Sequence, residues 1–168
     1  MNSPRALMRE KDHPAVNTEP LFVAPSSNVK PPVSHFRWSA RRLARTDDNT
    51  RVLVVDDYEV GAEALAAALS ADGYETRFAL SGIEAVRCLE AWQPDVIVLD
   101  INMPEYNGFE TARVMRGLNH SRECAIIAFT ALSAFNVIDK AQACGFDAYC
   151  QKGTSLENLI SLIDAFVA

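Results

Sequence analysis

The sequence contains no apolar run long enough to cross a membrane, since its continuous apolar stretches fall far short of the roughly 20 residues that a bilayer span needs. The N-terminus carries charges but no apolar segment of signal-peptide length. These two absences argue against membrane and secreted proteins. We therefore expect a soluble protein that resides in the cytoplasm.

Cysteine is also scarce, with four residues in a chain of 168. The spacings of these cysteines fit no zinc-binding pattern. Three of them fall in segments that read as strand or helix interiors, where Cys behaves as a small apolar residue. We expect free thiols rather than a structural zinc site or disulfides. The four residues are Cys88, Cys124, Cys144 and Cys150.

Positive charge becomes sparse after residue 50. Residues 1–50 contain eight Lys or Arg against five Asp or Glu, which gives +3, whereas residues 51–168 contain eight against seventeen, which gives −9. A segment this acidic repels phosphates, so we expect no direct DNA binding. The same acidity suits a protein that holds a hard divalent cation.

Proline, in contrast, is concentrated near the N-terminus, where six of the eight prolines precede residue 33. We expect residues 1–34 to be disordered or loosely extended. Residues 35–45, HFRWSARRLAR, are basic with two aromatics and predict a short amphipathic helix. This segment is either a solvated linker or a docking segment for an acidic partner, a nucleic acid or a membrane surface. We thus divide the chain into a tail, 1–50, and a domain, 51–168.

From residue 51 onward, short apolar runs alternate with segments of helical periodicity. Ser81 and Glu84 have the spacing of a capping box at the start of one helix. Alternation of this kind predicts an α/β fold with a parallel sheet and helices on both faces. Weaker apolar patterns at 74–79 and 146–150 favour edge strands. The expected strands are 51–55, 74–79, 95–100, 124–130 and 146–152, and the expected helices are 58–72, 81–92, 108–118, 133–143 and 154–167.

Polar residues follow four of these strands at their carboxyl ends. Asp56 and Asp57 end the first strand, Asp100 the third, Thr130 the fourth and Lys152 the fifth. In an open parallel sheet the ligand crevice lies outside the carboxyl ends of the strands. Residues nearly 100 positions apart in the sequence are therefore expected to meet there.

These residue types fit one reaction, the transfer of a phosphoryl group to a carboxylate. Three clustered carboxylates repel one another, and Mg²⁺ relieves that repulsion with the oxygen ligands it prefers. A carboxylate can attack phosphorus and form an aspartyl phosphate. The reaction then needs positive charge on the phosphoryl oxygens, which Mg²⁺ and Lys152 supply, while the Thr130 hydroxyl offers a hydrogen bond.

Together these residues make 51–168 resemble the receiver domain of two-component response regulators, over essentially a whole domain of that family. The resemblance implies a flavodoxin-like sheet of five parallel strands in the order 2-1-3-4-5. One position departs from the family pattern, because Gly153 follows the lysine where the family usually has Pro. The matching residues are Asp56-Asp57 after VLVV, Asp100 in VIVLDINMP, Gly108 at the next helix, Thr130-Ala131 after IIAF, and Lys152 in AYCQK.

The resemblance also implies roles for the acidic residues. Asp100 is the phosphoacceptor and takes the phosphoryl group from a phosphohistidine on a histidine kinase or a histidine phosphotransfer protein. Asp57 and Asp100 ligate Mg²⁺ directly, and Asp56 acts mainly through water. The backbone carbonyl of Asn102 completes the protein ligands.

A second group of residues is implied to transmit the signal. Thr130 moves toward the phosphoryl group, and Tyr149, three residues before Lys152, changes rotamer with it. This repacking alters the face around 132–152, which we expect to bind a downstream protein. Homodimer formation stays open.

Three functions remain open at this point. The first is a signalling switch rather than an enzyme, either as a stand-alone receiver, a phosphorelay shuttle or a fragment of a hybrid histidine kinase. The second is a phosphatase of the haloacid dehalogenase type, which needs a second acid where this chain has Asn102. The third is a degenerate receiver that serves only as a protein-interaction scaffold.

Overall fold

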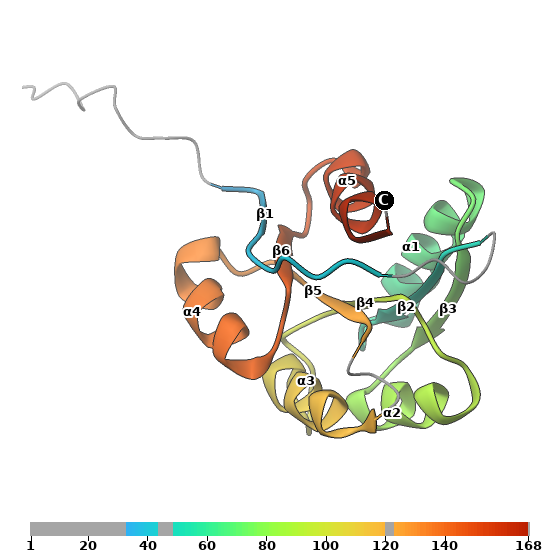
Figure 1. Ribbon diagram of the computed structural model, residues 1–168, viewed down its shortest axis with the longest axis horizontal. Helices are drawn as coiled ribbons and strands as arrows, with labels where there is room; N and C mark the ends of the chain where they lie inside the picture. The colour runs from blue at the N-terminus through green and yellow to red at the C-terminus, as the bar shows by residue number, and fades with distance from the viewer. Residues whose placement is uncertain (1–32, 44–48, 120–122, 168) are drawn as a thin grey trace, which may run out of the picture. The chain divides into compact units, whose positions relative to one another are not determined.

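The computed structural model describes residues 33–43, 49–119 and 123–167, so the expectation of a loose segment at 1–34 falls almost wholly outside the described residues. Strands and helices alternate through most of this region (Figure 1). The strands are β1 (His35–Arg37), β2 (Arg51–Val55), β3 (Glu75–Ala79), β4 (Val96–Leu99), β5 (Ala125–Thr130) and β6 (Ala148–Gln151). The helices are α1 (Glu59–Ala71), α2 (Gly82–Ala91), α3 (Gly108–Gly117), α4 (Ala134–Cys144) and α5 (Leu156–Val167).

The six strands form a single sheet in the order β1-β6-β5-β4-β2-β3. The pairs from β3 through β6 are all parallel, and β1 is antiparallel to β6. Numbered among themselves, the five parallel strands have the order 2-1-3-4-5, so the flavodoxin-like prediction is confirmed. Helices α2, α3 and α4 cover one face of the sheet, and α1 and α5 cover the other (Figure 1).

The central strands are mostly apolar because both faces of the sheet are covered. Successive side chains of β2 point to opposite faces and enter two separate cores. Leu53 packs on the side of α2, α3 and α4, whereas Val52 and Val54 pack on the side of α1 and α5. Since most side chains of these strands are buried and apolar, chemistry is expected from the residues beyond the strand ends.

Side-chain caps fix where two helices begin. The Ser81 side chain accepts a hydrogen bond from the Glu84 backbone N–H at 3.1 Å, which confirms the predicted cap at α2. The Glu84 carboxylate, however, accepts from the backbone N–H of Leu80. Helix α3 has the complete capping box, formed by Asn107 and Glu110, which the sequence reading overlooked.

The helix predicted within 35–45 is wrong for its described part. Residues 35–37 form β1, and residues 38–43 contain no helix; positions 44 and 45 lie outside the described residues. The backbone of this segment pairs with β6, with Phe36 opposite Tyr149. This pairing satisfies the free N–H and C=O groups of a strand that is otherwise at the sheet edge. The prediction of an edge strand at 146–150 is therefore wrong as well.

Within the described part of the chain, no helix has the length and apolar character needed to span a membrane. The four cysteines form no disulfide.

Candidate functional site

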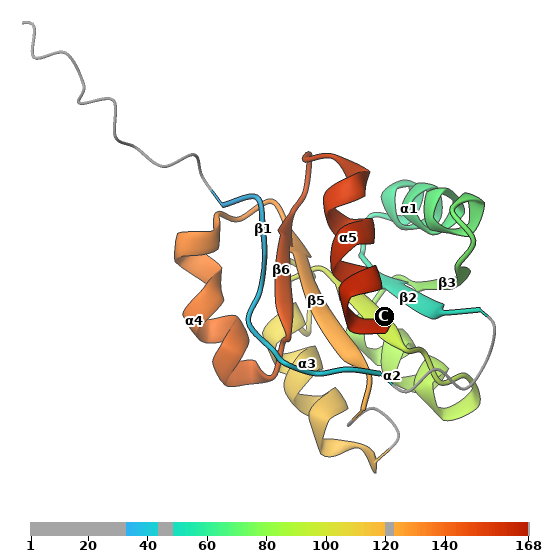
Figure 2. The ribbon, with the colours of Figure 1, turned by 45° about the horizontal axis from the view of Figure 1, so that its top comes forward.

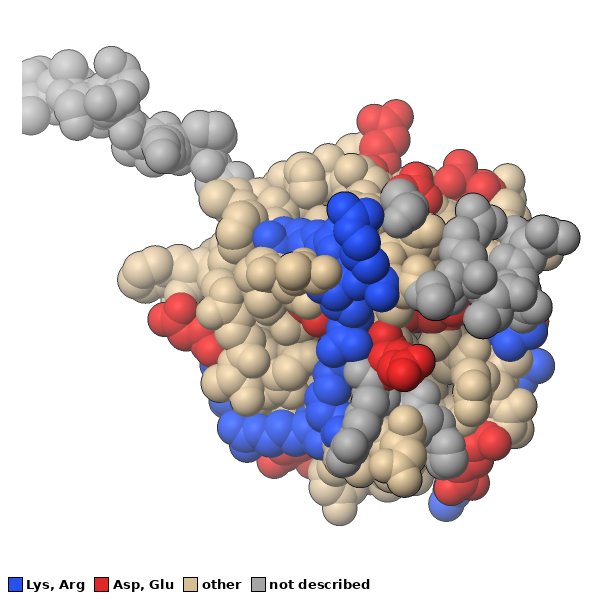
Figure 3. Space-filling model, viewed as in Figure 1, with Lys and Arg blue, Asp and Glu red and all other residues tan. Residues whose placement is uncertain are grey.

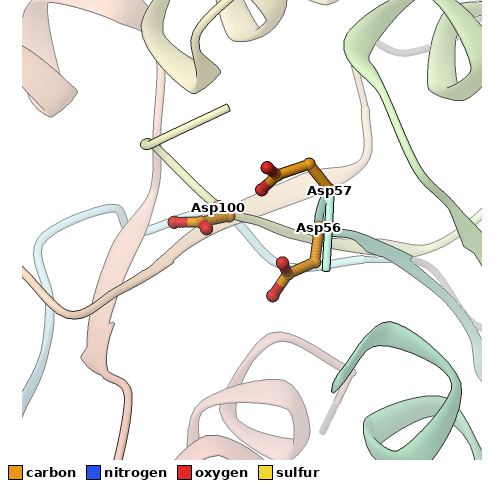
Figure 4. Close-up of side chains that lie close together, drawn as sticks. All are labelled: Asp56, Asp57 and Asp100. Carbon is orange, nitrogen blue, oxygen red and sulfur yellow. The ribbon is translucent and has the colours of Figure 1, made fainter. Parts of the chain in front are cut away.

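Three carboxylates meet at the carboxyl ends of two neighbouring strands. Asp56 and Asp57 follow β2, and Asp100 follows β4. One oxygen from each carboxylate lies within 4.8 Å of the others, and Figure 4 shows the three side chains gathered at this edge of the sheet. The Asp100 backbone N–H donates to the Val55 carbonyl at 2.8 Å, so the sheet pairing continues into the site and fixes both strand ends.

Local turns orient the two buried carboxylates. One oxygen of Asp56, Oδ1, accepts a hydrogen bond from the Tyr58 backbone N–H at 3.0 Å. The equivalent oxygen of Asp100 accepts from the Asn102 backbone N–H at 3.2 Å. Both are side-chain bonds to the backbone two residues ahead, the pattern of an Asx turn. In each residue the second oxygen, Oδ2, is thereby left to face the site.

Lys152 binds both of these second oxygens. Its Nζ lies 2.7 Å from Oδ2 of Asp56 and 2.7 Å from Oδ2 of Asp100. Burial alone lowers the lysine pKa, but the hydrogen bonds to Asp100 and Asp56 outweigh it and raise the pKa above its usual value. The ammonium form is thus secured where an incoming anion needs it.

The backbone around Lys152 explains how the side chain reaches the site. The Lys152 N–H donates to the Thr130 carbonyl at 2.9 Å, which extends the pairing of β5 and β6. Gly153 follows with a φ of +81°, a left-handed conformation that glycine adopts without strain. Although the family usually has proline at this position, the chain with Gly153 still brings the Lys152 ammonium to the Asp100 carboxylate.

Asp57 differs from its two neighbours because it is exposed. Lys152 pairs with the other two carboxylates, and no ion pair to Asp57 is found among the described residues. Three carboxylates beside one ammonium leave the cluster with excess negative charge. An all-oxygen set with unneutralised charge fits a hard divalent cation such as Mg²⁺.

Thr130 and Tyr149, predicted as switch residues, meet at one short loop. Both are fully buried. The Thr130 hydroxyl accepts a hydrogen bond from the Leu132 N–H at 3.4 Å, and the Tyr149 hydroxyl donates to the Leu132 carbonyl at 2.7 Å. Burial raises the pKa of Tyr149, so its hydroxyl stays a donor. The two residues thus meet at the backbone of Leu132. Because Leu132 takes part only through its backbone, its side-chain type gave no sign of this role in the sequence.

Gly108 has a steric role that the sequence alone does not show. A Cβ added at this position would lie 2.2 Å from the Asp100 carbonyl oxygen and 2.8 Å from the Ile101 Cα. The Gly108 N–H also donates to the Ile101 carbonyl at 2.9 Å. Helix α3 can therefore begin directly against the backbone of Asp100 only because residue 108 lacks a side chain.

Magnesium is expected to raise the melting temperature of the native protein, because a ligand that binds only the folded state stabilises it by about 2.7 kcal/mol at 100 times its dissociation constant. Asp57→Asn should abolish this increase without lowering stability in EDTA, because it removes one of three mutually repelling charges from an exposed position. Thermal unfolding with EDTA or MgCl₂ measures both effects. Asp72→Asn, at the far end of α1, is the matched control and should keep the full response. If Asp57→Asn kept the increase in melting temperature with MgCl₂, Asp57 would not be a magnesium ligand.

Comparison with known proteins identifies the relatives of this chain. The family model for the response regulator receiver domain matches residues 52–164. The response regulator MprA of Mycobacterium tuberculosis is 33% identical over 119 residues, which are 71% of this chain and 51% of MprA. The chain thus spans about half the length of this curated relative.

Solved structures of response regulators also align with this chain. The chemotaxis protein CheY4 of Vibrio cholerae aligns with a TM-score of 0.68 and 26% identity, covering 71% of this chain and 99% of CheY4. The response regulator TrrA of Thermotoga maritima, solved in complex with Mg²⁺ and beryllium fluoride, aligns with a TM-score of 0.62 and 30% identity. That alignment covers 70% of this chain and 99% of TrrA.

Proposed function

We propose that this chain, which belongs to the response regulator receiver domain family, is a switch in two-component or phosphorelay signalling that accepts a phosphoryl group on Asp100. The observation that carries the proposal is the bond from Lys152 to Asp100 within a cluster of three carboxylates. Asp100, like Asp56, has the lysine on one oxygen and a backbone N–H on the other. Its carboxylate is therefore held in one orientation for attack.

In the reaction, one Asp100 oxygen forms a bond to phosphorus as the bond from phosphorus to the donor's imidazole nitrogen breaks. The freed imidazole nitrogen keeps the electron pair and takes up a proton. Asp57, Asp100 and the Asn102 backbone carbonyl would hold Mg²⁺, with Asp56 acting mainly through water, and the ion would supply positive charge to the phosphoryl oxygens. The Lys152 ammonium moves from the Asp100 carboxylate to a phosphoryl oxygen, where it offsets the added negative charge.

The signal then leaves the site through the loop at Leu132. A phosphoryl oxygen attracts the Thr130 hydroxyl, which now contacts the Leu132 N–H. Because the Tyr149 hydroxyl binds the Leu132 carbonyl, a shift of Thr130 changes the environment of Tyr149. The face around 132–152 thereby passes between two states, with the populations set by the phosphoryl contacts.

The cellular setting is part of the same proposal. The donor is a histidine kinase or a histidine phosphotransfer protein, and the target is a protein that binds the face around 132–152. We place the protein in the cytoplasm. The similarity covers 99% of CheY4 and 51% of MprA, so relatives of both lengths share the domain to which the proposed switch belongs.

Incubation with acetyl phosphate and Mg²⁺, followed by intact mass measurement, tests the proposed function. The native protein is expected to gain the mass of one phosphoryl group. Asp100→Asn should gain none, and EDTA should prevent the gain in the native protein. An adduct that persists in Asp100→Asn would assign the chemistry to another residue.

A further inference from the structure

Residues 34–43 are here called the N-terminal strap. Its strand β1 lies beside β6 at the outer edge of the sheet between α4 and α5, and the residues after β1 run to the end of α5 (Figure 2). Three backbone pairs join β1 to β6, and the Gln151 N–H donates to the Ser34 carbonyl at 2.7 Å. The strap thus runs past the end of β6 next to Lys152. Figure 3 shows basic side chains gathered over the face that the strap crosses.

The strap is anchored by its side chains as well as by its backbone. Asp147, which is buried, binds the Arg41 guanidinium at 3.1 Å, and its carbonyl accepts from the N–H groups of Trp38 and Ser39. The Arg37 guanidinium lies 4.2 Å from the centre of the Phe166 ring. Because Arg37 and Arg41 bond to the rest of the fold, the strap is held against the sheet and is not a solvated linker.

The two aromatic residues of the strap are placed beside the switch tyrosine. Phe36 is directly opposite Tyr149 in the antiparallel pair, and such partners project from the same face of the sheet. Trp38, two residues on, shares that face and packs against the core cluster that contains Tyr149. The Trp38 indole N–H donates to the Phe146 carbonyl at 2.8 Å, which fixes the ring.

The strap therefore changes the surroundings of Tyr149. Without β1, β6 is the edge of the sheet, and a large side chain there has open space beside it. With the strap in place, Tyr149 has no exposed surface and its hydroxyl is committed to the Leu132 carbonyl. The same residue, Leu132, contacts the Thr130 hydroxyl through its N–H. Strand pairing thus links Phe36 to Tyr149, Trp38 packs against the same cluster, and the hydrogen bonds at Leu132 link Tyr149 to Thr130.

We propose that Trp38 and Phe36 are positioning residues for the phosphoryl site, which hold Tyr149 inward and thereby keep the Thr130–Leu132 loop ordered before the phosphoryl group arrives. The proposal rests on the proposed function at Asp100. A loop that is already ordered loses less conformational entropy when Thr130 binds the phosphoryl oxygens. The strap therefore increases the affinity of the site for a phosphoryl group, and strap and site are coupled through Tyr149.

Titration with beryllofluoride at saturating Mg²⁺, followed by calorimetry, measures this coupling in the full chain. Beryllofluoride is the probe because it mimics a phosphoryl group on a carboxylate. Trp38→Ala is expected to weaken beryllofluoride binding roughly five-fold or more, the lower range of typical coupling between sites. Its affinity for Mg²⁺ alone should stay unchanged, because the strap does not contact the three carboxylates. A general loss of folding would lower both affinities.

A double-mutant cycle tests whether Tyr149 carries the effect. Tyr149→Phe, which removes the hydrogen bond to Leu132, should weaken beryllofluoride binding similarly, and Trp38→Ala should add little in the Tyr149→Phe background. Leu43→Ala is the matched control, because this strap residue packs on the opposite core cluster and should leave binding unchanged. Fully additive effects of Trp38 and Tyr149, or an equal loss in Leu43→Ala, would overturn the proposal.

Two further results separate the possible failures. If Trp38→Ala does not fold, Phe36→Ala replaces it, because the Phe36 side chain is 46% exposed and its removal costs little core packing. The same weakening is expected, and unchanged binding in that variant would overturn the proposal. If the native protein binds no beryllofluoride, the proposed function fails. If native and strap variants bind it equally, only the role of the strap fails.

Discussion

Replacing Lys152 by alanine is expected to slow phosphorylation of Asp100 by acetyl phosphate by roughly 100-fold or more, the usual cost of removing one group that stabilises transition-state charge. The Lys152 ammonium is the cation that contacts both Asp56 and Asp100. Without it, the attacking carboxylate and the incoming phosphate repel each other with only Mg²⁺ to offset the charge. The rate of adduct formation by intact mass, with native protein beside Lys152→Ala, measures the effect.

The same variant is expected to be less stable in EDTA. Two buried carboxylates, each less than 10% exposed, lose their common partner. Removing one member of a buried pair costs about 3–5 kcal/mol, and the 27% exposure of the Lys152 side chain reduces this to about 1–3 kcal/mol. Mg²⁺ should restore more stability to Lys152→Ala than to the native protein, since it replaces the missing charge. Native phosphorylation rates in this variant would remove Lys152 from the mechanism.

Gly108→Ala is expected to lower the free energy of unfolding by about 1–3 kcal/mol or more, as overpacking does in a tightly packed site. Its new Cβ would lie 2.2 Å from the Asp100 carbonyl oxygen, a distance that real contacts do not reach. Either α3 moves outward or the backbone of Asp100 shifts, and both changes disturb the acceptor. We therefore expect weaker beryllofluoride binding together with the loss of stability. Urea unfolding and calorimetric titration measure the two effects.

Gly117→Ala provides a matched control in the same helix. Gly117 is the last residue of α3, and a Cβ there has no heavy atom within 4 Å. Alanine has the higher helix propensity, so this variant is expected to match or exceed native stability by up to ~1 kcal/mol. Beryllofluoride affinity should be unchanged. Equal effects of the two substitutions would show that the contact with Asp100 is unimportant.

Sequence patterns predicted the parallel sheet because burial on both faces leaves a clear signature. RVLVV, VIVL and AIIAFT are continuous apolar runs, and all three are central strands. RVLVV is followed by Asp56 and Asp57, and VIVL by Asp100, and these acidic residues have no role in the packing of an apolar strand. Since parallel strands bring their carboxyl ends to one edge, the meeting of Asp57 with Asp100 followed from topology, and the structure shows their carboxylates close together.

The conformation of the strap could not be predicted from its sequence because it depends on tertiary contacts. A three-residue strand is too short to show alternation, and the sequence 35–45 has enough basic and aromatic residues to resemble an amphipathic helix. Its conformation is decided by the unpaired backbone of β6 and by the buried carboxylate of Asp147, about 110 residues away in the sequence. The role of Leu132 between Thr130 and Tyr149 could not be predicted either, because Leu132 contacts both residues through its backbone.

The phosphoacceptor role of Asp100 can be tested at the level of the residue itself. Borohydride reduces an aspartyl phosphate to homoserine, so peptide mass mapping of the reduced, phosphorylated protein reports which carboxylate was modified. Homoserine is expected at position 100, with Asp56 and Asp57 unchanged. Homoserine at position 56 or 57, or no conversion in a protein that carries the phosphoryl adduct, would contradict phosphorylation of Asp100.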